Sequence, residues 1–149
     1  TLDKVKFRKV FLSSYNEELI ASLSYFDFYD ANYKDVQFVT LNLWFEKKYL
    51  NEPSFENIIF PSINYKAYKE LNEKYQKNFS RDIYHLEVLT FDMIPLIAST
   101  WFNSKDRKLK ASNFNGSYKG KTGNFSIKEN RANRDLILYK IINKKFKKI

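Results

Sequence analysis

Three short runs rich in apolar residues constrain the fold of this 149-residue chain more than any other feature. They cover residues 5–12, 36–41 and 56–61, and apolar residues make up more than half of each run. Strands with such near-continuous apolar character are typical of parallel sheets that are buried on both faces. The sequence therefore predicts an α/β fold built on a parallel sheet of the Rossmann-like kind.

The segment between the first two runs has the spacing of an amphipathic helix. Its apolar residues recur at positions i, i+1, i+4 and i+7, on Leu19, Ile20, Leu23 and Phe26. Ser14, followed three residues later by Glu17, has the pattern of a capping box. We therefore expect a strand that ends near Leu12 and a helix that begins directly after it.

Two longer amphipathic segments follow, at residues 64–79 and 82–102. The first places one apolar stripe on Tyr68, Leu71, Tyr75 and Phe79, and the second places another on Leu86, Leu89, Met93, Ile97 and Trp101. We expect both stripes to face the core. Pro95 predicts a kink in the second helix, or an end of its first part near Ile94.

The last third of the chain predicts strands and carries the positive charge. Residues 123–128 and 136–142 have strand character, and Asn143-Lys144 predicts a turn into a last strand around Phe146. The net charge is +9, and residues 103–149 hold 14 Lys and Arg against 3 Asp and Glu. We interpret this excess as a solvated basic face, and a basic nucleic-acid-binding module stays a remote alternative.

The composition argues against an enzyme. The chain has no cysteine and a single histidine, His85, so it offers neither a common zinc site nor a cysteine nucleophile with its base. Residues 116–122 resemble a phosphate-binding loop, but the spacing is one residue short and a strand is expected to follow. We expect no catalytic residues, no cofactor, no metal and no nucleic-acid partner.

Three stretches, in this order, resemble the family of periplasmic leucine-, isoleucine- and valine-binding proteins. The first is Val10-Phe11-Leu12-Ser13-Ser14-Tyr15 with the later Val36-Gln37-Phe38-Val39-Thr40, and the second is Leu89-Thr90-Phe91-Asp92-Met93. The third runs from Phe114 to Ile127 and is followed by Asn130-Arg131; it is similar to the glycine turn, Thr-Gly, strand and "Glu-Asn-Gly-Asp-Arg" that end the family. Asp92 stands at the family's helix acid, and we interpret it as structural.

The resemblance implies the fold of a type I periplasmic-binding protein, in which two α/β lobes close on a ligand. Residues 1–149 would be its C-terminal part, incomplete at the N-terminus. Residues 1–60 would form strand, helix and strand of one lobe, residues 61–122 helices that return to the other lobe, and residues 123–149 closing strands. The implied function is a non-enzymatic, periplasmic ligand-binding protein that serves a membrane transporter, at most peripheral to the membrane.

Within this family, the sequence looks most like bacterial penicillin-binding protein activators. The features that carry this likeness are Asp35-Val36-Gln37-Phe38, Leu43-Trp44 and the closing glycine-rich segment. Such proteins are lipoprotein-like and act on a cell-wall synthase. The alternative function is therefore activation of a synthase by protein contact.

Ligands of such folds bind at loops that follow the carboxyl ends of parallel strands. By position, the candidate ligand-binding residues are Ser13, Ser14, Tyr15, Asn42 and Trp44. Amino-acid-binding relatives have an aromatic residue at the position of Tyr15 and a carboxylate at that of Asn42. An amide cannot neutralise a buried ammonium, so we do not expect an ordinary amino-acid ligand. Trp44 is expected to line the cleft or a partner surface, or else to belong to the core.

Overall fold

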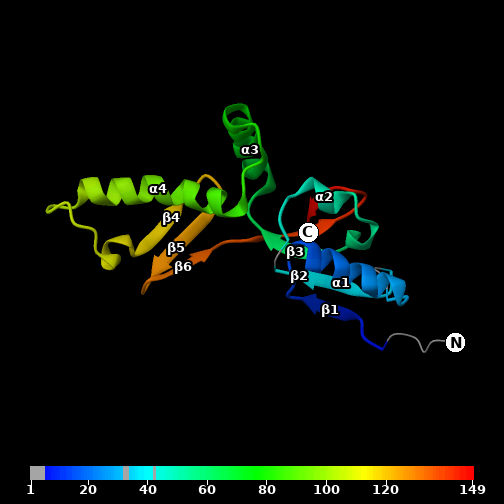
Figure 1. The fold of residues 1–149 in the computed structure, drawn as a ribbon. Helices are drawn as coiled ribbons and strands as arrows, with labels where there is room; N and C mark the ends of the chain where they lie inside the picture. Colours follow the sequence, from blue (N-terminus) through cyan, green and yellow to red (C-terminus); the bar gives the residue numbers. More distant parts are fainter. Residues whose placement is uncertain (1–5, 32–33, 42) are drawn as a thin grey trace. The chain divides into compact units, whose positions relative to one another are not determined.

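The computed structural model describes residues 6–31, 34–41 and 43–149, except for the side chain of His85. The fold is mixed α/β, with a five-stranded and a three-stranded sheet (Figure 1). The chain forms two compact units. Unit 1 contains the residues up to 62 together with 137–149, and unit 2 contains residues 63–136. The α/β class predicted from the sequence is confirmed.

Unit 1 holds the larger sheet, in the order β1-β2-β3-β7-β8. Its elements are β1 (Lys9–Leu12), α1 (Asn16–Phe28), β2 (Gln37–Thr40), α2 (Lys47–Leu50), the short 3-10 helix η1 (Pro53–Phe55), β3 (Ile59–Ser62), β7 (Ile137–Ile141) and β8 (Phe146–Lys148). The first three strands are parallel, as predicted, but β7 and β8 are antiparallel to their neighbours. The sheet is therefore mixed.

The antiparallel pairing of β7 follows from where the chain leaves and re-enters the sheet. Ser62, the last residue of β3, is paired with Ile137, the first residue of β7. The chain thus departs from and returns to the same end of neighbouring strands, so the returning strand must run in the opposite direction. The pattern of apolar residues within a strand does not predict the direction in which that strand runs in the sheet.

Aromatic side chains fill one face of the larger sheet. The Phe45 ring lies 5.1–5.9 Å, centroid to centroid, from the rings of three strand residues, Phe60, Tyr139 and Phe146. On β2, Phe38 contacts Phe26 of α1 at 5.3 Å. Burial of such rings supplies most of the apolar area that stabilises a domain of this size.

The hairpin that joins β7 to β8 confirms the predicted turn. Asn143 and Lys144 both have left-handed backbones, with φ of 52° and 56°. Positive φ at both central residues is the geometry of a type I′ turn, whose twist matches that of antiparallel strands. Ile142 and Lys145 exchange backbone hydrogen bonds of 2.9 and 3.2 Å across it.

The predicted capping box at the start of α1 is wrong. Tyr15 occupies the cap position with extended backbone and makes no side-chain capping hydrogen bond, so Ser14 lies one residue too early. The carboxylate of Glu17 faces Lys48 at 3.5 Å. The β1 strand begins at Lys9, and Val5 lies outside the described residues.

Unit 2 consists of two long helices and a three-stranded meander. Its elements are α3 (Tyr65–Phe79), α4 (His85–Asn103), the 3-10 helix η2 (Ala111–Phe114), β4 (Gly116–Lys119), β5 (Asn124–Lys128) and β6 (Arg131–Arg134). Both helices and β5 were predicted, whereas β4 and β6 were not. The helix α4 continues through Pro95, so the predicted end near Ile94 is wrong. A proline removes one backbone hydrogen bond, and buried residues on both sides of it anchor the helix.

The inward face of α4 differs from the predicted stripe. Val88, Asp92 and Leu96, spaced four residues apart, are the buried positions. Leu86 and Ile97 of the predicted stripe are 73% and 43% exposed. The carboxylate of Asp92 can be buried at the centre of this face because it is hydrogen-bonded there. A pattern of apolar residues does not predict a buried charged side chain. In α3, Tyr68 and Leu71 are buried as predicted, but the terminal Phe79 is exposed.

A charged cluster fixes the connection between α3 and α4. The guanidinium of Arg81 lies over the rings of Tyr75 and Tyr84, at 4.9 and 4.6 Å from their centroids. It donates hydrogen bonds of 2.5 and 2.9 Å to the Glu87 carboxylate, which also accepts the backbone N–H of Tyr84. These donors, that of Arg81 first, lower the pKa of Glu87 from its ordinary value of 4.5 to about 2.

The lowered pKa of Glu87 predicts an acid-sensitive contribution to stability. A carboxylate with a lower pKa in the folded than in the unfolded chain stabilises the fold above the unfolded value, and this contribution disappears as the pH falls. Glu87→Gln should therefore reduce the urea midpoint at pH 7, and the difference from the wild type should vanish between about pH 5 and pH 2.

Glu73→Gln is the matched control, because Glu73 makes only a 4.0 Å ion pair with Lys69 on the surface of α3. Its effect at pH 7 should stay below about 0.5 kcal/mol. A Glu87→Gln difference that persists unchanged to pH 2 would contradict the role assigned to the Arg81–Glu87 contact.

Candidate functional site

The carboxyl edge of β1 and β2 carries the predicted ligand-binding residues. The parallel register pairs Leu12 with Thr40, so the segments that follow both strands leave the sheet at one edge. Ser13 and Ser14 follow Leu12 directly, and the side chain of Tyr15 is 61% exposed. The Ser14 hydroxyl lies 3.4 Å from the hydroxyl of Ser22 in α1.

The segment after β2 contributes less exposed side-chain surface to this edge. Asn42, one of the predicted residues, lies outside the described residues. Leu41 before it is 66% exposed, whereas Leu43 after it is buried. Trp44 is 8% exposed and its ring lies 5.4 Å from Phe45, so it belongs to the aromatic core rather than to an open surface.

Three of the five predicted residues thus share the edge as a continuous segment. Ser13, Ser14 and Tyr15 present two hydroxyls and a phenol, which can donate and accept hydrogen bonds and offer a ring face. Groups of this kind can hold a small polar ligand by hydrogen bonds and ring contacts. Among the described residues, no cluster of three or more His, Cys, Asp or Glu side chains could hold a metal ion.

Among the described residues of unit 2, the carboxylate of Asp92 in α4 is the centre of a buried cluster of hydrogen bonds and an ion pair. One carboxylate oxygen accepts the backbone N–H of Lys121 at 2.6 Å. The other accepts the N–H and hydroxyl of Thr122, at 3.2 and 2.5 Å, and lies 3.3 Å from Arg134. The Arg134 guanidinium also donates to the Thr122 hydroxyl. The sequence analysis interpreted Asp92 as structural, which agrees with these contacts, but it did not predict Arg134 as a partner.

The turn between β4 and β5 depends on a glycine at its closest approach to this carboxylate. A Cβ atom added at Gly120 would lie 2.5 Å from Oδ2 of Asp92 and 2.8 Å from the carbonyl oxygen of Gly123. No side chain fits there without displacing the carboxylate or the turn. The Gly-x-x-Gly pattern is therefore a structural requirement of the α4 contact, not a phosphate site.

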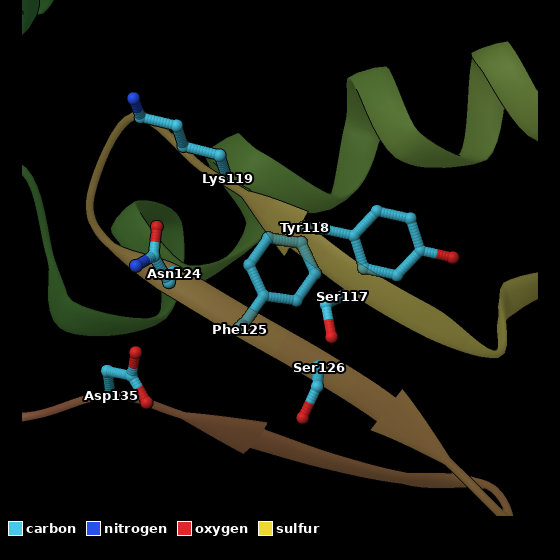
Figure 2. A pocket seen from close by; sticks show the side chains of 7 residues that line it. All are labelled: Ser117, Tyr118, Lys119, Asn124, Phe125, Ser126 and Asp135. Atoms are coloured by element: carbon cyan, nitrogen blue, oxygen red, sulfur yellow. The ribbon is translucent and has the colours of Figure 1, made fainter.

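A shallow hollow of about 430 Å³ lies over β4 and β5 (Figure 2). Its lining consists of Ser117, Tyr118, Lys119, Asn124, Phe125, Ser126 and Asp135. Figure 2 shows the Ser117 and Ser126 side chains alongside one another on neighbouring strands, which the register pairs. The Tyr118 and Phe125 rings are stacked at 5.3 Å. Lys119 and Asp135 give the rim both signs of charge, so the hollow has no preference for an anion or a cation.

The helices of the described part of the chain bear on any membrane role. None of them is long and apolar enough to cross a bilayer.

Asp92→Asn tests how much the buried contacts of Asp92 stabilise unit 2. The amide can replace one acceptor oxygen, but its NH₂ group then faces the N–H and hydroxyl donors that the other oxygen served, and Arg134 loses its countercharge. Breaking one partner of such a buried pair costs about 3 kcal/mol. Urea unfolding of a Trp44→Phe background, followed by Trp101 fluorescence in unit 2, should show this loss.

Asp27→Asn, on the exposed polar face of α1, is the control and should change stability by less than about 0.5 kcal/mol. Equal, small losses in both variants would show that Asp92 does not hold unit 2 together.

A scan of protein-family models and a search of the curated proteins each found no match to this chain.

Proposed function

We propose that the chain is the C-terminal part of a two-lobed, periplasmic solute-binding protein that binds a small ligand and catalyses no reaction. The observation that carries the proposal is the parallel register of β1 and β2, which pairs Leu12 with Thr40. This register puts Ser13, Ser14 and Tyr15 at the carboxyl edge of the parallel part of the sheet, and α/β folds bind their ligands at such edges.

The division of the chain supports the same proposal. The chain passes between the two units twice, after Ser62 and before Ile137, and these residues are paired strand neighbours. Both crossings lie at strand ends, and the ends of secondary-structure elements are where two-lobed proteins have their hinges. The likeness of residues 114–131 to the ending of the leucine-binding family points to the same architecture.

The chemistry of the edge narrows the ligand class. The described side chains that follow β1 and β2 at this edge are hydroxyl, phenol and apolar groups, and none of residues 13–15 and 41–43 in the sequence is acidic. Residues 13–15 themselves offer a ligand ammonium no countercharge, and the carboxylate of Glu17 in the first turn of α1 faces Lys48 at 3.5 Å. We therefore assign the site to a polar ligand that has no free ammonium group, such as a small carboxylate or amide.

A second candidate function is activation of a cell-wall synthase by protein contact, with a membrane-peripheral location. Burial of Leu43, Trp44 and Phe45 favours it, because these side chains occupy space beside the edge that a transport receptor would leave for its ligand. In this case Tyr15→Ala would leave activation of the synthase unchanged. Nucleic-acid binding has no comparable observation in its favour.

A thermal-shift screen tests the leading proposal. The probes are small carboxylates and amides without an amino group, each paired with the corresponding α-amino acid, for example 4-methylpentanoate with leucine. A ligand at about 100 times its Kd raises the stability by about 2.7 kcal/mol, which gives a measurable rise in the melting temperature. We expect the rise with a member of the first group and not with its amino-acid counterpart.

Tyr15→Ala should abolish that rise, whereas Tyr25→Ala should preserve it. The two tyrosines are matched in exposure, at 61% and 67%, but Tyr25 lies on the far part of α1. A rise that survives Tyr15→Ala, or the absence of any rise across the panel, would count against ligand binding at this edge.

A further inference from the structure

The five-stranded sheet of unit 1 has apolar side chains on both faces. On the covered face, the strands contribute buried residues such as Phe38, Phe60 and Tyr139. The alternate residues point to the opposite face, because side chains along a strand alternate between the two sides. The apolar residues on that opposite face are Phe11, Val39, Ile59, Pro61, Leu138 and Ile149. We call this set the open face.

The residues of the open face are contiguous across β1, β2, β3 and β7. Phe11 is paired with Val39, and Val39 with Ile59, in one row. Pro61 is paired with Leu138 in the next row. The N–H of Ile149 donates to the carbonyl of Leu138, which extends that row beyond β8. The apolar side chains therefore form one surface rather than scattered positions.

This surface is partly exposed, with Val39, Ile59 and Pro61 half-buried, although parallel strands are normally buried on both faces. Phe11 is 72% exposed, Leu138 50% and Ile149 56%. The helix α1 packs on the other face, where Phe26 contacts Phe38. An apolar surface of this extent on an α/β sheet is typical of a site that another layer covers.

Charged residues at both ends of the open face indicate the chemistry of that layer. Lys9 of β1 shares the face at one end, and the cross-strand pair Lys140 and Lys147 shares it at the other. The sequences of the five strands contain no Asp or Glu. We propose that the open face is covered by an amphipathic α-helix from polypeptide outside residues 1–149, with an apolar stripe flanked by acidic residues.

The dimensions of the sheet favour a helix over a second copy of the chain. Five strands about 4.8 Å apart and four residues long give a footprint of roughly 24 by 13 Å, or about 300 Å². A stable dimer buries about 800 Å² on each partner. A helix about 10 Å wide covers two strands, so one or two helices match the footprint. This proposal does not depend on the ligand proposed at the carboxyl edge.

The probe is a synthetic peptide of about 18 residues, with leucines at positions i, i+3, i+4 and i+7 and glutamates beside them. Binding to the 149-residue protein is measured by fluorescence anisotropy at low salt. Phe11→Asp should weaken binding at least tenfold, because it places a charge within the apolar contact. Phe28→Asp is the matched control: Phe28 is 78% exposed in the same unit but lies on α1, so binding should be unchanged.

A second peptide replaces the glutamates with lysines and should bind at least tenfold more weakly, because Lys9, Lys140 and Lys147 would repel it. Equal binding of both peptides, no binding of the acidic one, or equal effects of Phe11→Asp and Phe28→Asp would overturn the proposal. So would sedimentation equilibrium that shows the free protein dimerising through Phe11, because the occupant would then be a second copy.

Discussion

The structure of unit 1 depends on the pairing of β3 with β7. These strands lie 74 residues apart along the chain, and the four-residue register from Ile59 to Ser62 joins them. Without this pairing, β7 and β8 would lose their place in the sheet, and the Tyr139 and Phe146 rings would leave the Phe45 cluster. Closing so long a loop costs conformational entropy, which the aromatic contacts of the returning hairpin offset.

Unit 2, the segment between those strands, is stabilised by a different interaction. In unit 2, the Asp92 carboxylate collects backbone and side-chain donors from the β4–β5 turn and from Arg134. A buried carboxylate needs several donors, because its desolvation is otherwise unfavourable. The turn in return gains fixed geometry from Asp92, with Gly120 providing the space. An aromatic cluster therefore stabilises unit 1, and the buried hydrogen bonds and ion pair of Asp92 stabilise unit 2.

Much of the fold could be predicted from local pattern. The first three strands, α1, α3, α4, β5 and the Asn143-Lys144 turn follow from apolar periodicity and turn chemistry, which act over a few residues. The inward face of α4 could not be predicted, because a carboxylate rather than an apolar side chain occupies its centre. The short strands β4 and β6, with sequences GSYK and RANR, have no alternating apolar pattern. Their local sequences therefore do not predict that they pair with β5.

The candidate site was predicted in part for the same reason. Ser13, Ser14 and Tyr15 follow from the rule that ligands bind after the carboxyl ends of parallel strands, which needs only strand order. The location of Trp44 depends on how the segment after β2 packs into the core, where the neighbouring Phe45 contacts rings of strands that are distant in the sequence, and no local pattern encodes these contacts. Its burial removes the side chain from the edge and leaves the first segment as the main contribution of the described residues.

The proposed ligand site requires β1 and β2 to run parallel, and NMR measures the relative direction of the two strands most directly. In antiparallel strands, opposed α-protons approach closely at non-hydrogen-bonded pairs, whereas parallel strands instead show contacts between amide and α-protons of neighbouring strands. We predict α-proton to α-proton contacts between β3 and β7 at the non-hydrogen-bonded pairs Ile59–Lys140 and Pro61–Leu138, and none between β1 and β2. Such a contact between Val10 and Phe38 would contradict the parallel register, and with it the proposed site.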